Sequence, residues 1–252
     1  MALTHHLHGE GFAFFRDVCL NIHPILSLLK SGERFGFYLE SEKPYFRLKI
    51  ELSSNGSTRT LLFPEQFQEY PETLSGKVRL KKFFPNQNLP YETVIEVEQS
   101  GFTEIINQIL RVSYQMSGTV HVSKRSDQSL LLLKLSEAGG TEKIKITEEN
   151  LKHDEELFLR FDSLLVPGES NPEELIKLFH QHGFEYLAQR TIRFHCDCSR
   201  ERMIQNLDLY RQADPEPLFD ENRKTVSLTC EYCKTEYLIS AGELDPFLAV
   251  LN

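Results

Sequence analysis

Four cysteines near the end of the chain carry the strongest chemical signal. Cys196 and Cys198 form a CxC pair, 31 residues follow, and Cys230 and Cys233 form a CxxC pair. Two close pairs of thiolates match the ligand set of a tetrahedral zinc site. Residues two apart in an extended segment face the same side, so both cysteines of the CxC pair can face one ion. The pattern predicts one Zn²⁺ per chain, bound by all four cysteines.

The same four thiols can act as a redox switch. A site with four protein ligands has no open position, so hydrolysis by a metal-bound water is not expected and the chain is not predicted to be an enzyme. Each pair is close enough to form a local disulfide, although two Cα atoms that far apart in an extended CxC require a bend. Such a strained bond is readily reduced, which suits a sensor. Nearby arginines either stabilise thiolates or are ordinary surface charges: Arg193, Arg200 and Arg202.

The metal is also expected to decide whether the last quarter of the chain folds. This region of roughly 60 residues has few large apolar side chains, and a core of that size rarely supplies more than about 3–5 kcal/mol. Structural zinc in small peptides contributes on the order of 10–16 kcal/mol. The elements that position the cysteines are a helix capped by Ser199, with Met203, Leu207 and Tyr210 on one face, and strands on both sides of the CxxC pair.

The N-terminal part predicts an α+β core domain. In Tyr45–Leu52 apolar and charged residues alternate, and Asn55-Gly56 makes a natural turn into Thr58–Phe63. Further elements are expected in the following ranges: strands at Lys77–Phe84, Thr93–Val97, Thr119–Ser123 and Ser129–Leu135, and helices at Phe102–Val112 and around 157–165, the domain ending near Val166. Met1–Gly11, with His5, His6 and His8, is expected to be a mobile terminus. Cys19 is expected to be a buried thiol.

A linker helix is expected between the core and the cysteines. Asn171 is a plausible N-cap for a helix over Pro172–His182, and Gly183 stands where that helix would end. One face carries Leu175, Leu178 and Phe179, which must pack on something because an isolated helix this short is marginal in water. These three residues are either permanent core or a surface exposed by the switch.

Composition narrows the classes of partner. The 252 residues include 28 Lys+Arg and 37 Asp+Glu, a formal net charge of −9, which argues against general binding to nucleic acid or anionic membrane. No signal peptide or stretch of about 20 apolar residues is visible, so a cytoplasmic protein is expected. The alternative functions are a zinc-ribbon module that binds nucleic acid or protein, and a thiol-disulfide oxidoreductase, which would place its CxxC in a βαβ setting.

The cysteine region resembles the zinc domain of the redox-regulated chaperones of the heat-shock protein 33 family. The resemblance rests on Phe194–Arg202, which includes the CxC pair and Ser-Arg-Glu-Arg, and on Cys230–Cys233 with Tyr237. It implies an ATP-independent holdase, dormant when reduced and zinc-bound, in which oxidation forms the disulfides Cys196–Cys198 and Cys230–Cys233. Zinc release then unfolds the C-terminal region, and the active form, generally a homodimer, binds unfolding client proteins. By position the chain would comprise a core and client-binding domain (1–166), a linker (167–193) and a zinc-binding switch domain (194–252).

Overall fold

The computed structural model describes residues 1–133, 171–181, 183–213, 218–219 and 224–248. The chain forms two compact units, one comprising Ala2–Arg193 and the other containing Phe194–Asn252. The architecture is α+β, as the sequence predicts, with a large sheet in the first unit and the four cysteines in the second. Among the described residues, no helix has the length and apolar character needed to cross a bilayer.

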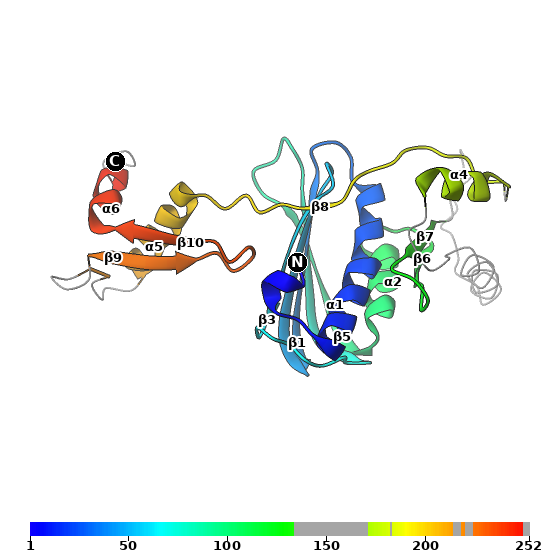
Figure 1. The fold of residues 1–252 in the computed structure, drawn as a ribbon, viewed down its shortest axis with the longest axis horizontal. Helices are drawn as coiled ribbons and strands as arrows, with labels where there is room; N and C mark the ends of the chain where they lie inside the picture. Colours follow the sequence, from blue (N-terminus) through cyan, green and yellow to red (C-terminus); the bar gives the residue numbers. More distant parts are fainter. Residues whose placement is uncertain (134–170, 182, 214–217, 220–223, 249–252) are drawn as a thin grey trace. The chain divides into compact units, whose positions relative to one another are not determined.

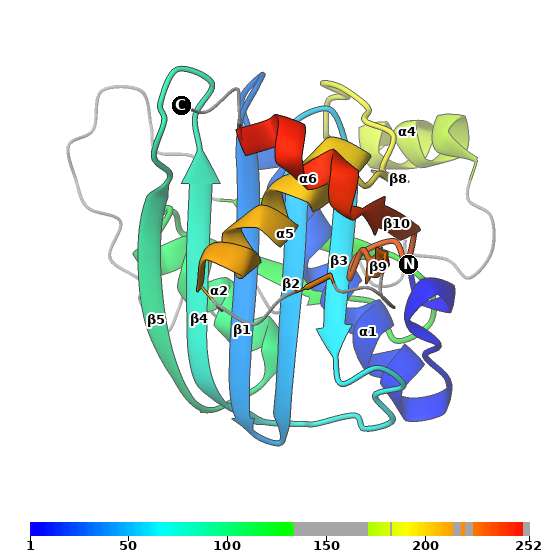
Figure 2. The same ribbon diagram turned by 90° about the vertical axis from the view of Figure 1, so that its left-hand side faces the viewer.

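An antiparallel sheet forms the centre of the N-terminal unit (Figure 2). Its strands follow this spatial order: β5 (Tyr91–Ser100), β4 (Leu74–Phe83), β1 (Arg34–Lys43), β2 (Tyr45–Ser53), β3 (Ser57–Phe63) and the short β8 (Arg193–Phe194). The alternation in β2 does what the sequence predicts, because Phe46, Leu48, Ile50 and Leu52 are fully buried between partly or fully exposed residues. Phe37 pairs with Ile50 on one side and with Leu80 on the other, so one face of the sheet is continuously apolar.

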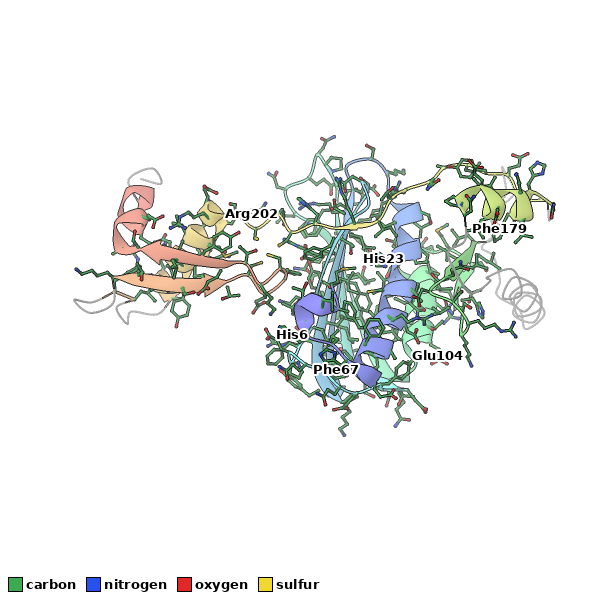
Figure 3. All side chains as sticks on the ribbon, in the orientation of Figure 1. His6, His23, Phe67, Glu104, Phe179 and Arg202 are labelled. Carbon is green, nitrogen blue, oxygen red and sulfur yellow. The ribbon has the colours of Figure 1, made fainter. Side chains whose placement is uncertain are left out.

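Two helices cover that apolar face, α1 (Gly9–Ile22) and α2 (Phe102–Val112) (Figure 1). Phe14 of α1 lies 5.5 Å from Phe46 and 5.7 Å from Phe67, measured between ring centroids. Phe67 lies between the sheet and α1 (Figure 3). The predicted stripe of α2 is buried, with Ile105 and Ile109 fully inaccessible to solvent. Aromatic packing between helix and sheet therefore holds this unit together.

The start of the chain is ordered, which corrects the expectation of a mobile terminus. A short 3₁₀ helix, η1 (Leu3–His5), precedes α1, and the His5 side chain is completely buried. Its Nε2 lies 2.8 Å from the carbonyl oxygen of Thr60 on β3. Burial of Leu7 beside it ties the segment down further. The polar sequence concealed this because a histidine that satisfies a buried carbonyl can be part of a core.

The remaining elements of this unit are η2 (His23–Leu28), the hairpin β6 (Gly118–Val122) and β7 (Ser129–Leu133), and α4 (Pro172–Gln181). The predicted helix around 157–165 and the domain end near Val166 lie outside the described residues. For α4 the predicted cap is confirmed, since Asn171 Oδ1 accepts a hydrogen bond from the Glu173 N–H at 3.0 Å. Gly183 follows the helix at a φ of +84°, a conformation that suits glycine at a helix end.

Residues 184–193 continue from α4 as an extended segment, called the strap below. At one end the Phe184 ring contacts Phe179 of α4, with centroids 6.0 Å apart. At the other end the Arg193 N–H donates to the Gly56 carbonyl at 3.0 Å, and the Arg190 guanidinium donates to the Leu26 carbonyl. Gly56 has a φ of +85°, and a Cβ there would lie 2.0 Å from the Thr191 carbonyl oxygen. The turn can accept the strap at this distance only because residue 56 has no side chain.

The C-terminal unit packs two helices against a hairpin. Its elements are α5 (Arg200–Ala213), the antiparallel strands β9 (Thr225–Thr229) and β10 (Glu236–Ser240), and α6 (Ala241–Leu248). The sequence predicts α5 and both strands but not α6. Among the residues of this unit that the structure describes, the buried apolar cluster is small: Ile204, Leu207, Ile239 and Leu244. So few buried side chains agree with the expectation that the apolar core alone is a weak source of stability.

Candidate metal centre

The two cysteine pairs reach one place from different backbone settings. Cys196 and Cys198 lie in the extended segment that leads into α5, which begins immediately after Ser199. The Ser199 side chain accepts a hydrogen bond from the Arg202 N–H at 3.3 Å, as the predicted cap requires. Cys230 and Cys233 lie in the tight turn between β9 and β10.

Backbone hydrogen bonds shape the CxxC turn. The Cys230 N–H donates to the Thr235 carbonyl at 2.9 Å, and the Lys234 N–H donates to the Cys230 carbonyl at 2.8 Å. Lys234 has a φ of +62°, which reverses the chain directly after the second cysteine. Both thiols of the pair therefore turn toward the CxC segment.

The four sulfurs form a compact cluster. All four Sγ atoms lie within 4.8 Å of one another. The distance from Cys196 to Cys230 is 3.7 Å and that from Cys198 to Cys233 is 3.3 Å, so each pair contacts the other. A tetrahedron with metal–sulfur bonds of about 2.3 Å has edges of about 3.8 Å, close to the spacing of these atoms. The donor set and its geometry fit a tetrahedral thiolate site for a metal ion.

Electrostatics also favour a cation at the centre of this cluster. Burial raises the pKa of Cys196, and the neighbouring thiols of Cys198 and Cys230 raise it further. Burial likewise raises the pKa of Cys198. For Cys233 burial acts in the same direction, but hydrogen bonds with Thr235 outweigh it, and the pKa is lowered. Neighbouring thiols do not readily all ionise, because their negative charges repel one another, and a bound cation compensates for this repulsion.

Two hydroxyl groups contact the sulfurs, one on each pair. The Tyr237 hydroxyl lies 3.1 Å from Cys198 Sγ, and the Thr235 hydroxyl lies 3.2 Å from Cys233 Sγ. Sequence reasoning placed Tyr237 on a strand and in the family resemblance, but assigned neither residue to the site. The signal was weak, because the left-handed backbone at Lys234 breaks the extended alternation between Cys233 and Thr235.

The arginines next to the cysteines have other partners. Arg200 forms an ion pair with Glu243 at 2.7 Å and also donates to the Leu238 carbonyl. Arg202, near the start of α5 (Figure 3), pairs with Asp197 at 2.6 Å. Arg193 donates its backbone N–H to Gly56. The ion pairs of Arg200 and Arg202 favour the interpretation of these two arginines as structural or surface charges rather than as thiolate partners.

The other candidate residues lie in the N-terminal unit. The Cys19 residue on α1 is partly exposed, but its thiol is buried as expected, and this burial raises the pKa of the thiol to about 12. Leu175, Leu178 and Phe179 are each half-buried on α4. None of the described residues of α4 is fully buried. A cavity of about 380 Å³ lies elsewhere in this unit, between Phe35, Phe84 and Tyr114.

Comparison with known proteins identifies the family to which the chain belongs. The family model described as Hsp33 protein matches residues 4–240. The 33 kDa chaperonin of Citrifermentans bemidjiense is 26% identical over 239 residues, which cover 88% of this chain and 79% of the relative. The 33 kDa chaperonin of Pseudomonas aeruginosa is 25% identical over 170 residues, which cover 66% of this chain and 56% of the relative. The crystal structure of the 33 kDa chaperonin (HSP33) of Thermotoga maritima aligns with 99% of this chain and 89% of its own at a TM-score of 0.66 and 17% identity, which supports the fold. Because the family model spans nearly the whole chain, the chain belongs to the Hsp33 family of chaperones.

Proposed function

We propose that this chain is a redox-regulated holdase that needs no ATP. In the reduced state all four cysteines bind one Zn²⁺, which folds the C-terminal unit and keeps the chaperone dormant. Oxidation activates it, and the active form, a homodimer, binds unfolding client proteins in the cytoplasm and prevents their aggregation. Residues 1–166 would provide the client-binding core, 167–193 the linker and 194–252 the switch.

The observation that carries this proposal is the closed cluster of four sulfurs. Four thiols that lie within 4.8 Å of one another satisfy a tetrahedral ion and leave no position for a substrate. They are also the most readily oxidised groups in a protein, so metal binding and redox sensing share the same atoms. The family of chaperones to which the chain belongs connects this site to the binding of unfolded proteins.

The redox step would be a two-electron oxidation of each cysteine pair. A thiolate sulfur attacks one oxygen of hydrogen peroxide, the O–O bond breaks, a sulfenic acid forms, and the other oxygen leaves as hydroxide, which takes up a proton to become water. The neighbouring thiol displaces the sulfenic oxygen as water, so two thiols and one peroxide yield one disulfide and two waters. We assign the disulfides to Cys196–Cys198 and Cys230–Cys233. Disulfide sulfur is a poor ligand, and release of the metal follows.

The α4 helix and the strap would transmit the change. Leu175, Leu178 and Phe179 are already half-buried, and neighbouring residues of the strap are exposed, with Leu187 at 90% and Tyr186 at 54%. A segment held by few buried contacts opens at low cost in free energy. Loss of the folded C-terminal unit would then free an apolar surface for clients, an order–disorder transition driven by a local event.

The decisive experiment measures metal content and chaperone activity together. Purified protein is assayed for zinc and for suppression of client aggregation, both reduced and after peroxide or hypochlorite with mild heat. We expect one zinc per reduced chain, zinc release on oxidation, and activity only in the oxidised sample. Release without activity, or activity without release, would refute the switch.

Two serine variants make this test specific. Cys198→Ser should weaken zinc binding, whereas Cys19→Ser removes the thiol on α1 and should leave zinc content and activation unchanged. If Cys198→Ser retains one zinc at unchanged affinity, the assignment of the ligands is wrong.

A further inference from the structure

The two hydroxyl contacts at the cysteine cluster fall on one sulfur of each pair. Tyr237 reaches Cys198 at 3.1 Å, and Thr235 reaches Cys233 at 3.2 Å. These two sulfurs are also 3.3 Å from each other, so the hydroxyls flank one edge of the cluster. Both belong to the segment after the CxxC turn, and they lie on separate sulfurs.

Packing fixes the position of the tyrosine. Tyr237 lies on β10, opposite Leu228 of β9, and its ring packs against the buried cluster of the C-terminal unit. The side chain is half-buried, which limits competition from water for its hydroxyl. Thr235 is exposed, so water competes more effectively for its hydroxyl. Of the two hydroxyls, that of Tyr237 is the better held.

A hydrogen bond to a thiolate changes the reactivity of the sulfur. When Cys198 is ionised, its sulfur can only accept, so the tyrosine hydroxyl donates. The donated proton draws electron density from the sulfur, and nucleophilicity toward peroxide falls with that density. The groups that hydrogen-bond to metal ligands commonly tune a metal site in this way.

We propose that Tyr237 sets the oxidant threshold of the site by donating a hydrogen bond to the Cys198 thiolate. This inference rests on the proposed redox function. Tyr237 acts through the sulfur as a positioning and tuning residue and does not bind the metal. Its hydroxyl slows the attack of the Cys198 sulfur on peroxide, so the reduced, dormant state persists at low oxidant concentration.

The test compares rates of peroxide-driven zinc release, followed with a chromogenic zinc chelator. Tyr237→Phe keeps the ring and removes only the hydroxyl, and we expect release to be faster by roughly 10-fold, the lower end of the effects typical of such partners. Tyr210→Phe removes a hydroxyl from an exposed tyrosine on α5 of the same unit and should leave the rate unchanged. Thr235→Val removes the hydroxyl beside Cys233 and should give a smaller increase.

A spectroscopic measurement distinguishes tuning from loosening of the structure. In Co²⁺-substituted protein the sulfur-to-metal charge-transfer absorption should shift to longer wavelength in Tyr237→Phe, because loss of the hydrogen bond raises the energy of the sulfur electrons. An unchanged spectrum together with an unchanged release rate would overturn the inference. So would faster release with no spectral shift and an equal loss of zinc affinity, which indicates a structural role. If wild-type zinc is not released by oxidant at all, the proposed function fails first.

Discussion

Replacement of Gly56 by alanine is expected to detach the strap from the core. In the wild type the Gly56 carbonyl accepts the Arg193 N–H at 3.0 Å. An alanine Cβ would lie 2.0 Å from the Thr191 carbonyl oxygen and 3.1 Å from its carbon, whereas ordinary contact begins at 3.4 Å. The Cβ is attached directly to the backbone of the turn, and the oxygen belongs to the backbone of the strap, so neither atom can rotate away. The strap must therefore move, and its hydrogen bond to the Gly56 carbonyl is lost.

The size of the effect follows from that one bond. A hydrogen bond between backbone groups contributes about 0.5–1.5 kcal/mol net, which corresponds to a factor of roughly 2–10 in the equilibrium between docked and released strap. Left-handed backbone at an alanine adds about 1–2 kcal/mol of strain to the core. Gly9→Ala is a suitable control because Gly9 also has a positive φ, of +51°, and a Cβ there meets nothing within 4 Å.

Hydrogen exchange measured by mass spectrometry provides the assay. Peptides that cover 184–193 should exchange roughly 2–10 times faster in Gly56→Ala than in the wild type, and Gly9→Ala should show no such increase. Under the proposed function, Gly56→Ala should also bind clients at milder oxidation. Unchanged exchange in a folded Gly56→Ala protein would show that the strap does not depend on this contact.

Three further predictions concern folding and stability. Glu33 is 5% exposed, and although burial opposes it, hydrogen bonds from the Lys30 N–H and the Lys82 ammonium lower its pKa. The stability that ionised Glu33 contributes is present above its ordinary pKa of 4.5 and is lost as the pH falls toward the lower pKa of the folded state. Below pH 4.5 the melting temperature should therefore depend less on pH in Glu33→Gln than in the wild type. Equal slopes in the two proteins would contradict this. His5→Ala should destabilise the core by about 1–3 kcal/mol in urea unfolding, because the Thr60 carbonyl loses its buried partner, and a change within error would show that the contact is dispensable. Removal of metal with a strong chelator should collapse the amide NMR dispersion of the C-terminal unit while the signals of the N-terminal sheet stay in place; retained dispersion would mean that the apolar core of this unit suffices without metal.

Much of the fold could be predicted where one local pattern dominates. The alternation in β2 and the stripe of α2 each specify a buried face, and both elements form where expected. The cap at Asn171 and the glycine after α4 also carry their own local signals. Helix α1 was missed because its apolar residues, including Phe14 and Phe15, follow a polar and glycine-containing start that is typical of a flexible end.

The candidate site was predictable only in its ligands. The four cysteines can be recognised as candidate metal ligands from their residue type and spacing alone, without knowledge of what surrounds them. Partners such as Tyr237 and Glu243 are ordinary residues whose roles arise from where β10 and α6 place them. The contact between Gly56 and the strap could not be predicted either. The sequence marks Gly56 only as a turn glycine, and Thr191, which lies close to it, is far away in the sequence.

The contacts between the two cysteine pairs have a consequence for chain connectivity. In the structure Cys196 meets Cys230 and Cys198 meets Cys233, so a shared metal would cross-link two segments and close the 31-residue loop between them. Closing such a loop removes entropy from the unfolded chain, and the disulfides proposed here would close only loops of a few residues. Exchange of the metal for two local disulfides would therefore keep every sulfur bonded yet cut the long-range tether. The chain would gain covalent bonds, and its C-terminal unit would lose its fold, in the same step.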